Sequence, residues 1–307
     1  MTNQRATEKR NLIICAAGDK KSYHKEWILG QRKFDLMLVH YGNISGQYKE
    51  DADLYFEKKG FKLEIIKDAI DANMEKIENY DAIWLPDDDL SICTEEINRL
   101  FEIFYEFNLD LAQPSIVGGN HNFLILKKRL FSRVRYTTFI EVQCPIFKKK
   151  VLLEMLPFFK ENRSGWGVDL IWSHRLRNQA VAIIDEVSVI HTRKSTPDSL
   201  HYKNLASLGI EAGIEYQALI ERHGLKKSMK KKTTGGIPKQ CSPHEWYYVS
   251  YARMIREELI INLIDVWQNK VIPNWKRGLG YFLRRLLRVA KRKIYSIMNK
   301  KGAAGLF

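Results

Sequence analysis

The chain has 307 residues, 45% of them hydrophobic, and its 50 Lys and Arg against 36 Asp and Glu give a net charge of +14. This length and apolar content exclude a disordered protein and allow one large α/β domain with an appendage. The charge is local: residues 1–224 carry 31 basic against 32 acidic side chains, and residues 225–307 carry 19 against 4. We therefore expect a catalytic domain over residues 1–204 and a basic helical region over residues 205–307 that meets a polyanion.

The cysteines and the N-terminus indicate the compartment. The four cysteines, at positions 15, 93, 144 and 241, show no paired or metal-ligand spacing, which indicates reduced and mostly buried thiols. Met1–Arg10 is polar and charged, so no signal peptide is expected, and no run of 18 apolar residues predicts a membrane span. These features predict a cytoplasmic protein that is soluble or peripheral to a membrane.

Strands and helices are expected to alternate through the first ninety residues. The pattern predicts strands at 11–17, 34–41, 61–66 and 82–85, and helices at 24–30, 53–59 and 69–79. Such an order is typical of an α/β fold with a mostly parallel central sheet, right-handed crossovers and flanking helices.

The second half is expected to add strands at 109–115, 136–147 and 181–190. Helices are expected at 95–107, 151–159, 169–177, 205–223 and 245–267. Lys226–Gly236 is rich in lysine and glycine, which predicts a flexible basic linker.

An acidic triplet follows the strand at 82–85. Pro86 ends the ladder, and Asp87, Asp88 and Asp89 then concentrate negative charge at the edge of the sheet where α/β proteins bind ligands. A divalent cation would relieve the repulsion, so this Asp-Xaa-Asp sequence is a candidate metal site for a nucleotide diphosphate. The alternative is an acidic turn in which Asp89 or Ser91 caps the helix that follows.

The first strand ends in a turn of small residues. Ala17, Gly18 and Asp19 allow close backbone approach, which suits a nucleotide base or ribose, although Gly-Asp is also a common turn. His191 follows the strand at 181–190 and could be an imidazole ligand for the same metal as Asp89, or a structural hydrogen-bonding group.

Gly165–Asp169 is the second candidate for chemistry. Two glycines flank Trp166, whose indole could form a flat wall for a sugar ring. Asp169 begins a helix, where the dipole would keep it ionised as a general base, or it could be a simple N-cap. Glu141 lies in an apolar stretch and would either line the site or form an ion pair.

Together these pieces resemble a GT-A-type glycosyltransferase, and more closely a family of plant and bacterial proteins catalogued as a domain of unknown function with a glycosyltransferase-like fold. The resemblance covers residues 11–193 and depends on six segments: Phe34–Gly42, Tyr80–Leu90, Leu109–Ile116, Phe139–Phe147, Gly165–Asp169 and Val181–His191.

The resemblance implies a role for each position. Asp87 would lie near the ribose and the metal, Asp89 would ligate Mn²⁺ or Mg²⁺, and His191 would complete the metal site. Trp166 and Asp169 would face the acceptor, with Asp169 as the base of an inverting transfer. Asp88 fills the variable place of the motif, so it is open which two of the three aspartates face the metal.

The resemblance therefore predicts a nucleotide-sugar donor and a glycan or lipid-linked acceptor, as in surface polysaccharide synthesis. Trp275–Lys301 carries ten Lys and Arg and no acid, with apolar residues at helical spacing, which is typical of a helix on an anionic membrane. Helix packing on the domain is the alternative, and nucleic acid is not expected because no base-reading module is present. A nucleotidyl- or phosphotransferase and a non-catalytic scaffold are the alternative functions.

Overall fold

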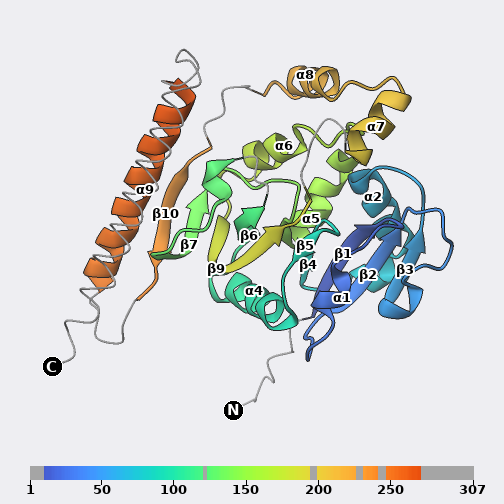
Figure 1. Cartoon of the computed structure of the whole chain (residues 1–307), viewed down its shortest axis with the longest axis horizontal. Helices are drawn as coiled ribbons and strands as arrows, with labels where there is room; N and C mark the ends of the chain where they lie inside the picture. The colour runs from blue at the N-terminus through green and yellow to red at the C-terminus, as the bar shows by residue number, and fades with distance from the viewer. Residues whose placement is uncertain (1–9, 120–122, 194–198, 226–230, 241–246, 271–307) are drawn as a thin grey trace. The chain divides into compact units, whose positions relative to one another are not determined.

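The computed structural model describes residues 10–119, 123–193, 199–225, 231–240 and 247–270 (Figure 1). The chain separates into two compact units, Met1–Met254 and Ile255–Phe307. The first unit holds the sheet and every predicted site residue. The basic segment at residues 275–301 lies outside the described residues.

The first unit is built on one mixed sheet with the order β10-β7-β9-β6-β8-β4-β1-β2-β3 (Figure 1). The short strand β5 (Leu90–Ser91) pairs antiparallel with β9. β1, β2, β3 and β4 are mutually parallel, and β6 is parallel to β9. The remaining bounds are β1 Asn11–Ala17, β2 Asp35–His40, β3 Leu54–Glu57, β4 Ala82–Trp84, β6 Leu111–Gly119, β7 Ser132–Thr137, β8 Ile146–Lys148, β9 Val181–His191 and β10 Thr233–Pro238. The predicted fold class, a mostly parallel sheet core flanked by helices, is confirmed.

Two groups of helices flank the sheet. α1 (His24–Trp27) contacts α4 (Thr94–Glu106), while α2 (Lys62–Ala72), α5 (Lys149–Met155) and α6 (Val168–Arg175) all contact the 3₁₀ segment at Leu156–Lys160. The β1–α1–β2 and β3–α2–β4 crossovers run in opposite directions along the sheet, so right-handed connections place α1 and α2 on opposite faces. The order therefore reverses between β1 and β4, the type of position where such sheets bind ligands.

The helix predicted at 53–59 and the strand predicted at 61–66 are both wrong, because the structure has a strand in the first segment and a helix in the second. Leu54–Glu57 is the edge strand β3, and Lys62 begins the helix α2. Alternation over Phe61, Leu63 and Ile65 suggested a strand. The buried set of α2 instead continues at helical spacing through Ile66, Ala69 and Ile70, and this longer period decides the fold.

The predicted strand at 136–147 is also wrong as one element. β7 ends at Thr137 and β8 begins at Ile146, so residues 138–145 form a loop. The loop joins the chain after β4, because Leu85 N–H donates to Pro145 O (2.8 Å) and Asp87 N–H to Gln143 O (2.9 Å). This loop carries Glu141 to the edge of the sheet beside the acidic triplet.

The predicted linker at 226–236 is not a linker throughout. Residues 233–238 form β10, which pairs antiparallel with β7 at the sheet edge. The predicted helix at 205–223 is two helices, α7 (Leu200–Ser207) and α8 (Ala212–Arg222), separated at Gly209, whose φ is +68°. The helix predicted at 245–267 is present as α9 (Tyr247–Lys270). None of the helices among the described residues is both long and apolar enough to cross a bilayer.

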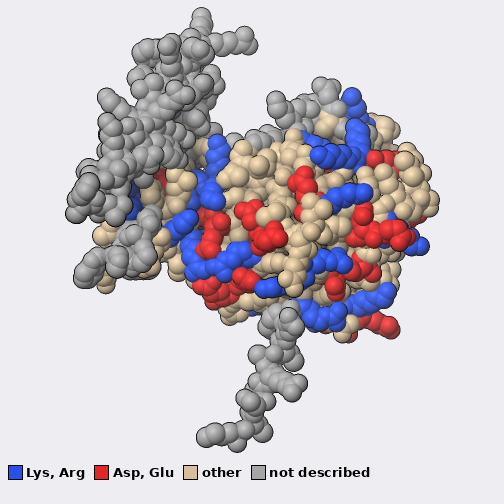
Figure 2. Space-filling model, turned by 60° about the horizontal axis from the view of Figure 1, so that its bottom comes forward, with Lys and Arg blue, Asp and Glu red and all other residues tan. Residues whose placement is uncertain are grey.

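Charge and thiols in the described residues follow the sequence expectations. Figure 2 shows Lys and Arg interspersed with Asp and Glu over the visible face, and many form ion pairs, such as Arg133 with Glu106 at 2.7 Å. Cys15 and Cys144 are free and buried, whereas Cys93 is free and exposed.

Candidate functional site

The acidic triplet lies where the strand order reverses. β4 ends at Trp84, and Asp87 then forms a parallel bridge with Ala16 near the end of β1. The three carboxylates have different partners: Asp87 pairs with the Lys62 ammonium, Asp88 with Arg193 (2.7 Å) and Asp89 with His191 (3.1 Å). Each carboxylate of the triplet thus has a partner of its own.

β9 delivers His191 to this turn. His191 is paired with Leu90 in the β5–β9 ladder, and Thr192 donates to Asp89 O from its backbone N (3.0 Å) and its hydroxyl (2.8 Å). One ligand atom each from Asp87, Asp89 and His191 lie within 4.8 Å of one another. The structure therefore brings together the three predicted ligands and leaves Asp88 with Arg193.

The chemistry of these side chains fits a divalent cation. Asp89 Oδ1 is buried and has no hydrogen-bond partner among the described residues, an arrangement that is costly without a cation or water. Burial raises the pKa of Asp87. The positive charge of Lys62 opposes this shift, and the negative charge of Asp89 adds to it. Carboxylate oxygens with one imidazole suit Mn²⁺ or Mg²⁺, which would hold both carboxylates ionised.

Gln143 is a neighbour of His191 that the sequence analysis missed. Its Nε2 lies 2.9 Å from His191 Nδ1, and its Oε1 is buried without a hydrogen-bond partner in the described chain. A half-turn of the side-chain amide exchanges its nitrogen and its oxygen. With the amide turned over, Oε1 would accept from Nδ1–H, and the Nε2 lone pair of His191 would face Asp89 as a ligand requires.

Lys62 is a second group that the sequence analysis missed, because its segment was predicted to be a strand. From the first turn of α2, its ammonium donates to Asp87 Oδ1 and to the carbonyl oxygens of Val142 (2.9 Å) and Gln143 (3.1 Å). Three donors meet three acceptors, so Lys62 fastens the triplet to the 138–145 loop.

Asp88 lies on the other side of the turn. Burial raises the pKa of Asp88 to about 6, although the positive charge of Arg193 opposes this shift. Asp88 Oδ2 is buried and has no hydrogen-bond partner in the described part of the chain. An unsatisfied oxygen here leaves a place for a hydroxyl or water donor.

The predicted nucleotide turn is shaped by Asp19. Its carboxylate accepts from the backbone N–H groups of Asn43 (2.6 Å) and Ile44 (3.2 Å) and lies 3.2 Å from His40 Nε2. These bonds hold the turn after β2, so much of the acceptor capacity of Asp19 is used internally. Ala17 and Gly18 are buried, and a Cβ on Gly18 would lie 2.9 Å from the Tyr41 ring.

The acceptor-side candidates lie around the start of α6. Gly165 and Gly167 have φ of +75° and +88°, a region that glycine adopts readily, and they present Trp166 with 45% of its surface exposed. Burial and, to a smaller extent, the charge of Glu141 raise the pKa of Asp169 to about 7, although the charge of Lys231 opposes this shift. The expectation that the helix dipole keeps Asp169 ionised is therefore wrong, because desolvation outweighs the dipole.

The 138–145 loop links the two groups of residues. Glu141 is buried at 4% exposure, its N–H donates to Gln113 Oε1 (2.9 Å), and its charge acts on Asp169. Two residues on, Gln143 contacts His191. The metal candidates and the acceptor-side candidates thus share one supporting loop.

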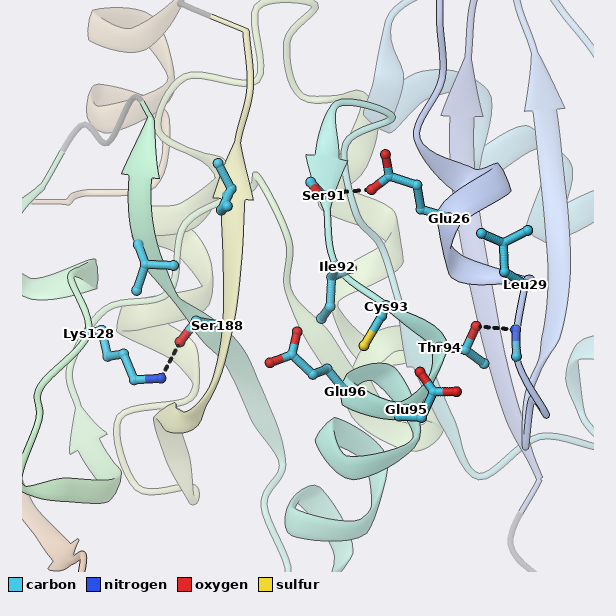
Figure 3. A pocket seen from close by; sticks show the side chains of 13 residues that line it. Glu26, Leu29, Ser91, Ile92, Cys93, Thr94, Glu95, Glu96, Lys128 and Ser188 are labelled. Atoms are coloured by element: carbon cyan, nitrogen blue, oxygen red, sulfur yellow. Dashed lines mark hydrogen bonds between the residues drawn. The ribbon is translucent and has the colours of Figure 1, made fainter.

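A hollow of about 670 Å³ lies elsewhere in the described structure. Figure 3 shows Lys128 and Ser188 on one wall and Ile92, Cys93 and Glu96 on the facing wall. It is formed by residues around β5, β9 and the start of α4, and none of the predicted site residues lines it.

The fold and the site define an α/β protein in which two aspartates and a histidine that could hold a metal ion lie at the reversal point of the sheet. No family model matches the chain, and no curated protein matches it in sequence. Similar solved structures are two forms of TarS from S. aureus and a Desulfovibrio desulfuricans G20 protein named for a proposed nucleotide-diphospho-sugar transferase activity.

The likeness to these structures is distant. The first TarS structure gives a TM-score of 0.42 at 11% identity over 72% of this chain and 44% of its own. TarS 1–349 gives a TM-score of 0.43 at 10% identity, over 86% of this chain and 75% of its own. The Desulfovibrio protein gives a TM-score of 0.39 at 12% identity, over 69% of this chain and 97% of its own. This chain thus spans less than half of the longer TarS chain. Scores of this size assign no activity, so function must be argued from the site.

Proposed function

We propose that this protein is a metal-dependent glycosyltransferase of the GT-A type that moves a sugar from a nucleotide-sugar donor to a glycan or glycolipid acceptor. The observation that supports this most is the convergence of Asp87, Asp89 and His191 within 4.8 Å at the reversal point of the sheet. Mn²⁺ or Mg²⁺ held there would neutralise charge that develops on the departing diphosphate. The turn at Ala17, Gly18 and Asp19, with Asp87 and Asp88, would hold the nucleotide.

The acceptor would bind beside Trp166 and Glu141, and Asp169 would take its proton in an inverting transfer. A pKa of about 7 suits this role, because a general base works best when its pKa lies near the operating pH. Glu141 would tune Asp169 through its charge. The catalytic unit proposed for residues 1–204 would then need α8 as well, because Tyr216 and Leu219 pack against Gly167.

The basic C-terminal segment is proposed to hold the enzyme on the inner face of an anionic membrane, beside a lipid-linked acceptor for surface polysaccharide. This rests on the ten Lys and Arg of Trp275–Lys301 in the sequence. Vesicles of phosphatidylcholine with and without phosphatidylserine test it in a co-sedimentation assay. Deleting residues 275–307 should abolish binding to the anionic vesicles, whereas equal sedimentation of both proteins would contradict the proposal.

A thermal-shift screen tests the proposed activity. Nucleoside diphosphates and nucleotide sugars are added to the full-length protein with Mn²⁺ or with EDTA. A ligand that binds only the folded state stabilises it, by about 2.7 kcal/mol when the ligand concentration is a hundred times Kd. This stabilisation raises Tm. We expect one nucleotide to raise Tm only with metal. Products then separate the alternatives, since a glycosyltransferase releases a nucleoside diphosphate and a nucleotidyltransferase releases pyrophosphate.

A further inference from the structure

Trp166 is exposed and yet firmly held. Its backbone N–H donates to Ser164 Oγ (3.3 Å), and its carbonyl accepts from Asn162 Nδ2 (2.7 Å). Glu215 of α8 accepts from the backbone N–H groups of Arg163 (3.2 Å) and Ser164 (2.8 Å). A large apolar side chain left 45% exposed on a fully bonded loop is typical of a binding surface rather than of the core.

The indole itself is fixed by two tyrosines. Trp166 Nε1 donates to the Tyr202 hydroxyl (3.2 Å), with ring centres 6.3 Å apart at 89°. Tyr216 lies 6.4 Å from the indole at 82°. Because Nε1–H lies in the plane of the indole, the Tyr202 hydroxyl meets the edge of the ring and does not cover its faces. The ring therefore has a set orientation before any ligand arrives.

This aromatic group borders both halves of the proposed site. Burial raises the pKa of the Tyr216 hydroxyl, and the charge of Asp169 adds to this effect. On the other side Tyr202 contacts His201, with ring centres 5.1 Å apart. Loss of solvation lowers the pKa of His201, and the charge of Asp87 opposes this. The packing agrees with this. Tyr216 approaches Gly167, two residues before Asp169. The His201 ring lies 5.8 Å from that of Phe61, next to Lys62, which donates to Asp87.

The chemistry of the group fits the face of a sugar ring. An oriented indole offers an apolar face, while the Tyr202 hydroxyl and the His201 ring can exchange hydrogen bonds with sugar hydroxyls. The side chains follow one another from the 162–167 loop onto α7, so ring contacts continue beyond the one indole. A chain of sugars would use this continuation, and a single sugar would not.

We propose that Trp166, Tyr202 and His201 form an oligosaccharide-binding platform, that Tyr202 and Tyr216 are its positioning residues, and that the acceptor is a neutral glycan of several sugars. This inference rests on the proposed transferase function, because only a transferase would use the bound glycan as an acceptor. The binding step itself needs neither donor nor metal. The two ideas can therefore fail separately.

The test measures glycan binding by the full-length protein in EDTA, without nucleotide. The probes are neutral hexasaccharides of glucose, N-acetylglucosamine and mannose, each with its monosaccharide, and the readout is broadening of the glycan NMR signals. We expect at least one hexasaccharide to bind about tenfold or more tightly than its monosaccharide. A wild-type protein that broadens none of the hexasaccharide signals overturns the platform. Absence of metal-dependent nucleotide binding with intact glycan binding would instead overturn the transferase.

Variants distinguish stacking of the glycan on the platform from non-specific binding to exposed apolar side chains. Trp166→Ala should weaken glycan binding about tenfold or more, as loss of a central aromatic anchor does. Tyr202→Phe keeps the ring and removes the acceptor of the indole N–H, so a loss of about two- to tenfold is expected. The matched control is Leu208→Ala, an aliphatic side chain 56% exposed just after α7, which should not change binding. Equal binding by wild type and Trp166→Ala, or equal losses in Leu208→Ala and Trp166→Ala, would overturn the proposal.

Discussion

The imidazole Nε2 of His191, the last residue of β9, lies 3.1 Å from Oδ2 of Asp89, which immediately precedes β5 and is far away in the sequence. The contact is imposed by the β5–β9 ladder, in which Leu90 is paired with His191. The backbone thus sets the separation of two candidate ligands.

Gln143 should set the affinity for metal through His191. Gln143→Leu removes the amide next to Nδ1 and should weaken Mn²⁺ binding about 10- to 100-fold, the usual cost of losing such a support. Gln143→Glu keeps an acceptor for Nδ1–H and should bind Mn²⁺ at least as well as Gln143→Leu does. Isothermal titration calorimetry measures both. Wild-type affinity in Gln143→Leu would show that Gln143 does not orient the ligand.

The stability of the protein should depend on pH through Asp169. Its folded-state pKa of about 7 lies above the ordinary value of 3.8. The folded protein therefore holds a proton that the unfolded chain releases, and this contribution to stability is lost as pH rises from about 4 through 7. Asp169→Asn removes the loss, so its stability relative to wild type should increase from pH 5 to pH 8 in urea unfolding. A constant difference between the two proteins would contradict the raised pKa.

The rate should follow the same carboxyl group. Glu141, Lys231 and Tyr216 are the charged or titratable groups that act on Asp169 or feel its charge. As a base Asp169 must be ionised, so kcat/KM should rise with pH around a midpoint near 7. Asp169→Asn should lower kcat about 100-fold or more with little change in donor KM. Lys231→Met should move the midpoint to higher pH, since Lys231 lowers the pKa.

The two glycines beside Trp166 should differ in their tolerance of alanine. Both have positive φ, so each Gly→Ala change should cost about 1–2 kcal/mol. A Cβ on Gly167 would also lie 3.0 Å from Tyr216 and 3.1 Å from Leu219, whereas one on Gly165 meets only Leu63 at 3.9 Å. Gly167→Ala should therefore cost about 1–3 kcal/mol more. Equal midpoints in urea unfolding would contradict the close packing of α8.

One buried ion pair should stabilise the far half of the sheet. Arg135 of β7 pairs with Asp185 of β9 at 2.6 Å, with side chains 1% and 0% exposed. Asp185→Ala leaves a buried guanidinium uncompensated and should cost about 3–5 kcal/mol. The control is Asp71→Ala, half of an exposed pair with Lys67 on α2, where a loss of about 0.5 kcal/mol or less is expected. Equal losses in the two variants would contradict this account of the pair.

Much of the sheet could be predicted because buried strands leave a local signature. β1, β2, β4 and β9 are rich in apolar, mostly buried residues, and each was found near its true bounds. The two errors at β3 and α2, where a helix and a strand were predicted, have the opposite cause: a weak local signature. β3 is a four-residue edge strand with partly exposed side chains, so it has little apolar pattern of its own.

The ligand candidates could be predicted because they follow buried strands directly. The supporting residues could not, because their roles arise only from pairing between distant segments. Gln143 reaches His191 through a loop that the apolar pattern showed as a strand, and Lys62 reaches Asp87 from a helix predicted as a strand. Tyr216 lies in a region expected to be an appendage, and Tyr202 lies in a stretch for which no helix was expected. Their contacts with Trp166 depend on how α7 and α8 pack beside the 162–167 loop.

The central claim is that Asp89, and not Asp88, holds the cation. Free Mn²⁺ measured by electron paramagnetic resonance during titration of wild type, Asp89→Asn and Asp88→Asn tests it within one acidic triplet. We predict one Mn²⁺ bound per wild-type chain, the same stoichiometry in Asp88→Asn with affinity reduced only by a lost nearby charge, and no saturable binding in Asp89→Asn. Equal Mn²⁺ binding by Asp89→Asn and wild type, or none by wild type, would contradict the account.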